Sequence, residues 1–204
     1  MNSAWTAGVG AVAGAGGAMM VRRIPRGARL SAPVCAVLVA ALWAVVGARS
    51  GADLPLWWWP VPLILAWGGV LLSGVDLVAR RLPDALTLPA YPLVAIVLAI
   101  AASGAGNVDP LLRAAVGTLL WAGGYAAIRL VSPGALGGGD VKLAGSLGAL
   151  AAATSWSGLM LAVVVASALT VMVAVPARVF GYRDIPHGPA MLAAAWLVVL
   201  HPPV

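Results

Sequence analysis

Long apolar stretches separated by short polar connections run through almost the whole chain of 204 residues. A helix that crosses a bilayer needs about 20 apolar residues, and the connections here contain Pro, Gly and Asp, which end helices and turn the chain. The pattern therefore predicts an all-α fold, a polytopic bundle of about eight transmembrane helices. The predicted helices span residues 4–21, 32–49, 57–77, 86–103, 111–131, 141–154, 156–176 and 187–201.

The composition excludes a water-soluble globule and a disordered chain. Hydrophobic residues make up 62% of the sequence and charged residues only 9%, whereas a soluble domain has about 25% charged residues. Little of the chain is left for a soluble domain, so we expect one integral-membrane domain over residues 1–204. Cys35 is the single cysteine, which excludes a disulfide framework and a zinc site built from several cysteines.

The basic residues predict the orientation in the membrane. If the first predicted helix runs from outside to inside, only Arg49 and Arg113 of the 12 basic residues fall outside. Cytoplasmic connections are enriched in Lys and Arg, so we expect both termini outside the cell. The basic residues form no continuous face, which argues against a nucleic-acid partner. Those predicted on the cytoplasmic side are Arg22, Arg23, Arg26, Arg29, Arg80, Arg81, Arg129, Lys142, Arg178 and Arg183.

Small residues and tryptophans suggest roles in packing and anchoring. Gly10, Gly14 and Gly17 form a stripe that lets helices approach closely in lipid. The run 57–59, three consecutive tryptophans, is expected to lie at the level of the lipid headgroups, where indole rings are favoured.

Two aspartates are closely tied to predicted apolar helices at the cytoplasmic face. Asp76 lies near the inner end of the third predicted helix, and Asp140 directly precedes the sixth. A carboxylate inside a bilayer costs about 2.5–3.5 kcal/mol at mid-depth, so its presence suggests a function. Structural explanations also exist: Asp76 could pair with Arg80 four residues later, and Asp140 could cap the following helix.

Two carboxylates that lie close together favour one chemistry in particular. Both cannot easily ionise, so one keeps a proton and acts as an acid while the other acts as a base. This pair can activate water against a peptide bond without a metal or cofactor. Gly137, Gly138 and Gly139 would leave the backbone open to an extended substrate. His187 is interpreted as a turn residue rather than a catalytic one.

Four segments resemble the type IV prepilin peptidases, membrane aspartyl proteases of the GxGD type. The segment 137–143, Gly-Gly-Gly-Asp-Val-Lys-Leu, resembles the second aspartate motif of that family. Asp76, followed by Pro83-Asp84, resembles the first. The segments 23–27 and 185–189 resemble an N-terminal signature and an Ile-Pro-x-Gly-Pro turn. The four occur in family order and cover nearly the whole chain.

The resemblance implies a function and a set of roles. Asp76 and Asp140 would be the catalytic pair, and Gly137, Gly138, Gly139 and Asp84 would bind substrate, with Asp84 or Asp184 holding a basic leader. The substrate would be a prepilin or pseudopilin, cut after a glycine on the cytoplasmic side of a bacterial plasma membrane. Further partners would be lipid and pilus or secretion assembly proteins.

The chain differs from the longer members of that family in one segment. Those members carry a cytoplasmic insert with paired Cys-x-x-Cys motifs, associated with zinc and N-methylation, whereas here the chain after Arg29 passes directly into the second predicted helix. We therefore expect cleavage without methylation. Two alternatives stay open: another GxGD membrane protease, and a transporter or scaffold whose aspartates bind a cation.

Overall fold

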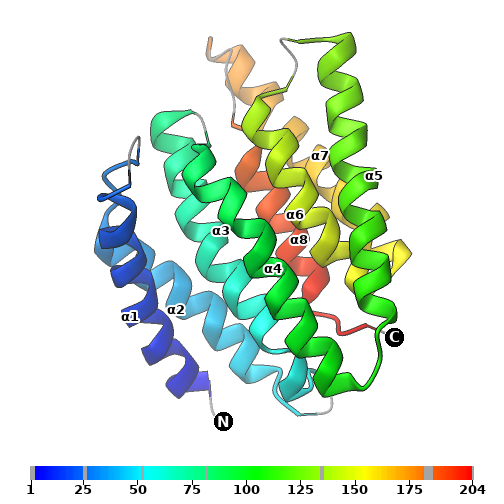
Figure 1. Cartoon of the computed structure of the whole chain (residues 1–204). Coiled ribbons are helices and arrows are strands. Elements are labelled where there is room, and N and C mark those ends of the chain that lie inside the picture. The colour runs from blue at the N-terminus through cyan, green and yellow to red at the C-terminus, as the bar shows by residue number, and fades with distance from the viewer. Residues whose placement is uncertain are drawn as a thin grey trace.

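The computed structural model describes residues 3–24, 27–51, 53–80, 82–133, 136–181 and 186–203. In these segments the fold is all-α, with eight α-helices, one short 3-10 helix (η1) and no strand (Figure 1). The helices are α1 (Ser3–Val21), α2 (Ala32–Ala48), η1 (Leu56–Trp58), α3 (Pro60–Ala79), α4 (Asp84–Ala105), α5 (Asp109–Val131), α6 (Gly138–Thr154), α7 (Trp156–Val179) and α8 (Gly188–Val199).

Five of these segments are long and apolar enough to cross a membrane. They are Ser3–Val21, Leu56–Ala79, Asp84–Ala105, Asp109–Val131 and Trp156–Val179. The helices α2 and α8 are apolar but shorter, and α8 has 12 residues. At 1.5 Å per residue α8 spans about 18 Å, less than the roughly 30 Å of a bilayer core. The expected number of eight spans therefore stays a prediction.

The bundle consists of a pair, α1 and α2, packed beside a larger group that contains the other helices. Glycines make the α1–α2 contact close: a methyl group at Gly10 would lie 3.0 Å from the carbonyl oxygen of Val39, and one at Gly14 would overlap the Cys35 carbonyl. Gly17 lies against Trp67 and Leu71 of α3 in the same way. The predicted packing role of this glycine stripe is thus confirmed.

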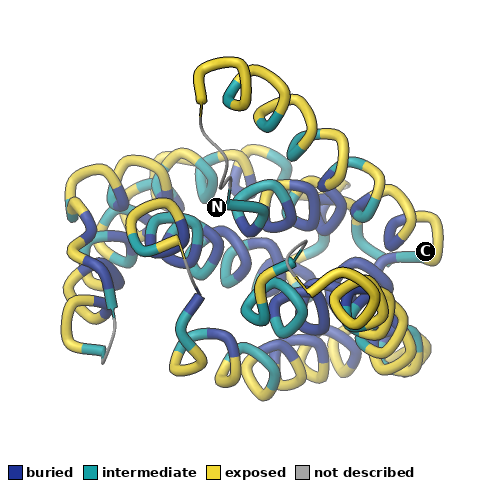
Figure 2. Tube along the Cα trace, turned by 90° about the horizontal axis from the view of Figure 1, so that it is seen from above, coloured by how far each residue is buried: buried dark blue, intermediate teal, exposed yellow. Residues whose placement is uncertain are grey.

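Helix α6 lies in the middle of the larger group. All of its residues from Leu143 to Thr154 are buried, and Figure 2 shows buried positions turned inward while exposed positions face the outside of the bundle. Close approach to α5 depends on small residues, because a Cβ atom at Gly117 would overlap Ala152 and one at Gly148 would overlap Gly117. This helix therefore holds Asp140, in its first turn, on a well-packed frame.

Two of the three consecutive tryptophans, Trp58 and Trp59, are core residues rather than lipid-exposed anchors. Trp58 and Trp59 are only 1% and 4% exposed, so they belong to the core. The indole N–H of Trp58 donates a hydrogen bond of 2.7 Å to the carbonyl oxygen of Val199, and that of Trp59 donates one of 3.2 Å to Leu54. Burying these rings and satisfying both N–H groups outweighs a headgroup position.

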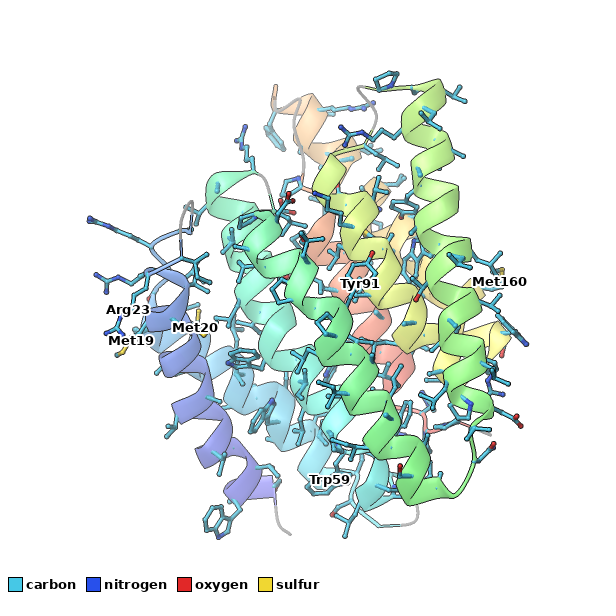
Figure 3. All side chains as sticks on the ribbon, viewed as in Figure 1. Met19, Met20, Arg23, Trp59, Tyr91 and Met160 are labelled. Carbon is cyan, nitrogen blue, oxygen red and sulfur yellow. The ribbon has the colours of Figure 1, made fainter. Side chains whose placement is uncertain are left out.

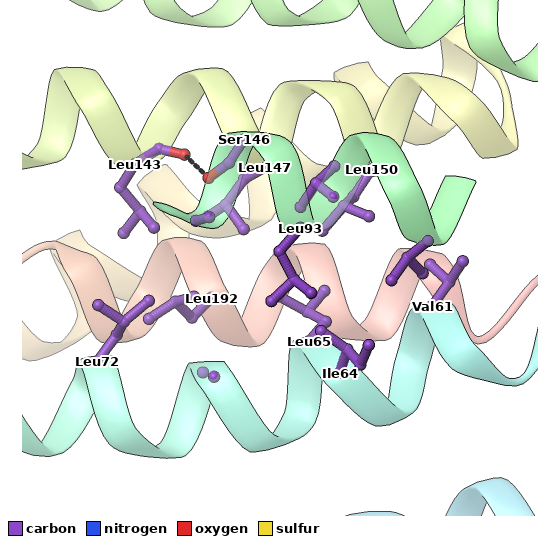
Figure 4. Close-up of a pocket in the computed structure, with 15 residues that line it drawn as sticks. Val61, Ile64, Leu65, Leu72, Leu93, Leu143, Ser146, Leu147, Leu150 and Leu192 are labelled. Atoms are coloured by element: carbon purple, nitrogen blue, oxygen red, sulfur yellow. Dashed lines mark hydrogen bonds between the residues drawn. The ribbon is translucent and has the colours of Figure 1, made fainter. Parts of the chain in front are cut away.

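An apolar cavity of about 60 Å³ lies among α3, α4, α6 and α8 (Figure 4). Aliphatic side chains such as Leu72, Leu143 and Leu192 line it. The one hydroxyl in the lining, that of Ser146, already donates to the carbonyl oxygen of Leu143 at 3.0 Å. The cavity therefore offers no polar group to a reaction, and the chemistry of the protein lies elsewhere.

The two ends of the described chain lie at one end of the bundle, and Asp76 and Asp140 lie toward the other (Figure 1). The described basic residues other than Arg49 and Arg113 lie at the aspartate end: Arg22, Arg23, Arg29, Arg80, Arg129, Lys142 and Arg178. Arg26, Arg81 and Arg183, also predicted there, fall outside the described residues.

Candidate active site

Asp76 lies one turn before the end of α3 and faces the protein interior. The helix ends in a left-handed turn at Arg80, with φ of 50°, and the Arg80 N–H donates to the Asp76 carbonyl oxygen at 2.8 Å. The side chain of Asp76 is 5% exposed. Its Oδ2 atom is buried without a hydrogen-bond partner, which is costly for a carboxylate and typical of a functional group.

The alternative ion pair between Asp76 and Arg80 is not formed. Among the described residues the one ion pair joins Lys142 and Asp84. Asp76 instead approaches the start of α8, where a methyl group at Gly188 would lie 2.6 Å from Oδ2. The Gly188 N–H interacts with this carboxylate, but the Oδ2 atom has no hydrogen-bond partner.

Asp140 is the third residue of α6, so it is not the N-cap itself, although its side chain takes part in a capping box at the helix start. Gly137 occupies the N-cap position, and its N–H donates to Oδ2 of Asp140 at 3.3 Å. The carboxylate thus lies beside the free N–H groups at the start of a helix, where a negative charge is favoured. The side chain is half-buried and remains partly open to solvent.

The start of α8 brings the two aspartates together. Helix α8 packs against both α3 and α6: its first residue, Gly188, contacts Asp76, and the preceding residue, His187, interacts electrostatically with Asp140. The Asp140 carboxylate in turn acts electrostatically on Asp76. The two carboxylates therefore lie within electrostatic range of each other at the same end of the bundle.

The glycines before Asp140 are needed for space rather than for an unusual backbone. None of the three has a positive φ. A methyl group at Gly139 would lie 2.8 Å from Cβ of Leu82, and one at Gly138 would lie 2.5 Å from a guanidinium nitrogen of Arg129. Side chains of the protein itself therefore approach these glycines, and a substrate-binding role for Gly137, Gly138 and Gly139 remains a proposal.

Asp84 lies at the start of α4 and pairs with Lys142 of α6. The Lys142 Nζ and Asp84 Oδ1 atoms are 2.6 Å apart, and the two side chains are 39% and 61% exposed. The Tyr91 hydroxyl fixes the backbone next to this pair by donating to the Lys142 carbonyl oxygen at 2.7 Å; Figure 3 labels Tyr91 where α4 meets α6. Asp184, the other candidate for leader binding, falls outside the described residues.

His187 is the residue whose position the sequence did not reveal. Its ring stacks on Tyr125, with centroids 5.7 Å apart, and its Nε2 atom lies 2.8 Å from the Tyr125 hydroxyl. Its Nδ1 atom forms a short hydrogen bond with the Thr170 hydroxyl. The interpretation as a turn residue holds for its backbone, which precedes α8, but its side chain is part of the site.

Comparison with known families shows which family the chain belongs to. The model of the type IV leader peptidase family matches residues 63–175, more than half of the chain. The chain belongs to this family. The matched region contains Asp76, Asp84 and the segment 137–140 but ends before His187. The search of the curated proteins and the search of the solved structures gave no match.

Family membership makes this chain a peptidase of the leader-peptidase type, and its long apolar helices indicate a membrane protein. Substrates of the prepilin type follow in general from the family. Among the described residues, no group of three or more His, Cys, Asp or Glu side chains could hold a metal ion.

Proposed function

We propose that this protein is an aspartyl endopeptidase that removes the leader of a prepilin or pseudopilin at the cytoplasmic face of a bacterial plasma membrane. One observation carries the proposal: Asp76 from α3 and Asp140 from α6 interact where both meet the start of α8. The proposal includes one membrane domain over residues 1–204 with eight spans and both termini outside.

The proposed reaction uses the two carboxylates in complementary protonation states. The ionised aspartate takes a proton from a water molecule, whose oxygen attacks the scissile carbonyl carbon, and the protonated aspartate then delivers its proton to the departing amine. The family match favours this peptidase chemistry over a cation transporter.

An apolar groove supports a route for the substrate helix. It has a volume of about 660 Å³ and lies between α2, α3 and α8. Ser73 and Leu77, within one turn of Asp76 on either side, and Pro189, next to Gly188, form part of its lining. The groove therefore runs along α3 and α8 beside the candidate site, and we propose that it receives the apolar helix that follows the leader.

Filling this groove tests the route. Ala193 is exposed in the groove, so Ala193→Trp is expected to raise KM about tenfold for a substrate that carries its apolar helix. A peptide limited to the leader and the cleavage site should be cut as before. Ala115→Trp, on an exposed face of α5, is the control. Unchanged kinetics with the full substrate, or equal losses with both substrates, would contradict the proposed route.

Asp84 is proposed to hold the basic leader by exchanging its Lys142 partner for a leader cation. An exposed ion pair contributes up to about 1 kcal/mol, or roughly fivefold in affinity. Lys142→Met should therefore lower KM for a basic-leader substrate by up to about fivefold, and Asp84→Asn should raise it, with kcat unchanged in both. Steady-state kinetics checks this prediction. If both variants have the KM of the wild type, Asp84 has no part in leader binding.

Mass spectrometry of the product tests the proposed reaction and the absence of methylation together. The purified protein, mixed with a pilin-like chain, should remove a leader at a Gly bond and leave an unmodified N-terminal amine, with or without an added methyl donor. The helix α2 begins shortly after Arg29, and Cys35 is buried inside it. A methylated product made by this protein alone would refute this part of the proposal.

A further inference from the structure

The side chain of His187 is fixed by two helices that contain neither aspartate. Tyr125 of α5 bonds its Nε2 atom and stacks on its ring, while Thr170 of α7 bonds its Nδ1 atom. The backbone of the same residue is the N-cap of α8, with its carbonyl oxygen accepting from the Met191 N–H at 3.2 Å. One side chain thus ties the start of α8 to α5 and α7.

The hydrogen bonds define which nitrogen carries the proton. The Thr170 hydroxyl donates its one proton to the Ala166 carbonyl oxygen at 2.9 Å, so towards His187 it must accept. The Nδ1 atom therefore carries hydrogen, and in a neutral ring Nε2 accepts from the Tyr125 hydroxyl.

The fixed ring lies within electrostatic range of one aspartate, and the next residue contacts the other. His187 interacts electrostatically with Asp140, as does Tyr125. Gly188 lies so close to Asp76 that a methyl group there would be 2.6 Å from Oδ2. A small shift of residues 187–188 would therefore change the surroundings of both carboxylates.

We propose that His187 is a positioning residue, whose ring, tied to Tyr125 and Thr170, sets the start of α8 so that Asp76 and Asp140 hold their relative geometry. The inference rests on the proposed aspartyl peptidase function. The titratable groups that face this ring are Asp140 from α6 and Tyr125 from α5, while α7 contributes the uncharged Thr170. Both ring nitrogens are already bonded, so His187 acts through position and not as a proton donor to substrate.

Two substitutions at His187 separate positioning from packing. His187→Phe keeps the ring and its stacking but loses both hydrogen bonds, so kcat should fall at least about tenfold while KM stays within about twofold. His187→Gln offers an amide donor and an acceptor in place of the two ring nitrogens, and it should recover kcat to within about threefold of the wild type. The kcat and KM of both variants are measured on detergent-purified protein. Thermal unfolding curves like that of the wild type show that each variant is folded.

The partner hydroxyls supply an independent test that leaves His187 intact. Tyr125→Phe and Thr170→Val each remove one hydrogen bond to the ring and should each lower kcat severalfold. Thr118→Val is the matched control, because its hydroxyl also donates to a carbonyl one turn earlier, that of Ala114, but has no histidine beside it. This control should retain wild-type kcat.

The outcomes distinguish this inference from the proposed function. Wild-type kcat in His187→Phe, or equal losses in the Phe and Gln variants, would overturn the positioning role. If His187→Phe does not fold, wild-type kcat in both hydroxyl variants would overturn it as well. The proposed function itself fails only if Asp140→Asn still cleaves in the same assay, whatever His187 does.

Discussion

Replacement of either aspartate by asparagine, Asp76→Asn or Asp140→Asn, is expected to abolish cleavage, by at least about a thousandfold in kcat. An amide has nearly the size of the carboxyl group but cannot take up or release the proton that the reaction needs. A positioned acid or base contributes about 10²–10⁴ in rate, and each variant leaves the pair without one partner. The measurement is the rate of leader release from a prepilin-like substrate.

A matched control separates this loss from a general effect of removing negative charge. Asp53 is exposed in the connection between α2 and α3, so Asp53→Asn should cleave at the wild-type rate. All three variants should show similar unfolding curves in detergent. Substantial cleavage by Asp76→Asn or Asp140→Asn would exclude the aspartyl mechanism, although the family assignment would stand.

Gly188→Ala is expected to lower kcat by about a hundredfold or more, the second largest effect. The added methyl group would lie 2.6 Å from Oδ2 of Asp76, closer than real Cβ atoms approach other atoms. Either the carboxylate rotates or the start of α8 moves, and both change its relation to Asp140. A misplacement of this kind can cost about 10²-fold in rate. Single-turnover cleavage kinetics checks this prediction.

The control for this substitution is another glycine in a helix. Gly123 of α5 has no atom within 4 Å of where a methyl group would lie, and alanine is favoured over glycine inside a helix by about 1 kcal/mol. Gly123→Ala should therefore keep full activity and stability. Equal activities of Gly188→Ala and Gly123→Ala would mean that the close contact at Asp76 has no role in the reaction.

Much of the fold follows from the sequence because lipid imposes simple constraints. Every backbone group must be satisfied internally in a membrane, so apolar stretches predict helices whose ends agree with the structure to within a few residues. The glycine stripe on α1 was also predictable, because close packing between helices needs small residues. The number of spans and the orientation are harder to predict from the sequence, because a short apolar helix such as α8 does not show whether it crosses the membrane.

The candidate site could be predicted only in part. Carboxylates are rare in apolar helices, so Asp76 and Asp140 stand out in a chain with six acidic residues. Nothing comparable marks His187, because its partners Tyr125 and Thr170 are distant in sequence and become neighbours only through the packing of α5, α7 and α8. The tryptophans were misread for the same reason: Trp58 reaches Val199 at the far end of the chain.

Cross-linking between positions 76 and 140 tests whether these two side chains share one site. In the variant Asp76→Cys/Asp140→Cys/Cys35→Ser, the shortest bifunctional thiol reagents should join the two new cysteines in membranes, because both positions belong to the proposed site. The matching Asp76→Cys/Asp109→Cys/Cys35→Ser variant should not react, since Asp109 begins α5 at the opposite end of the bundle. If both thiols of the first variant react with single-site reagents but do not cross-link, Asp76 and Asp140 do not share one site.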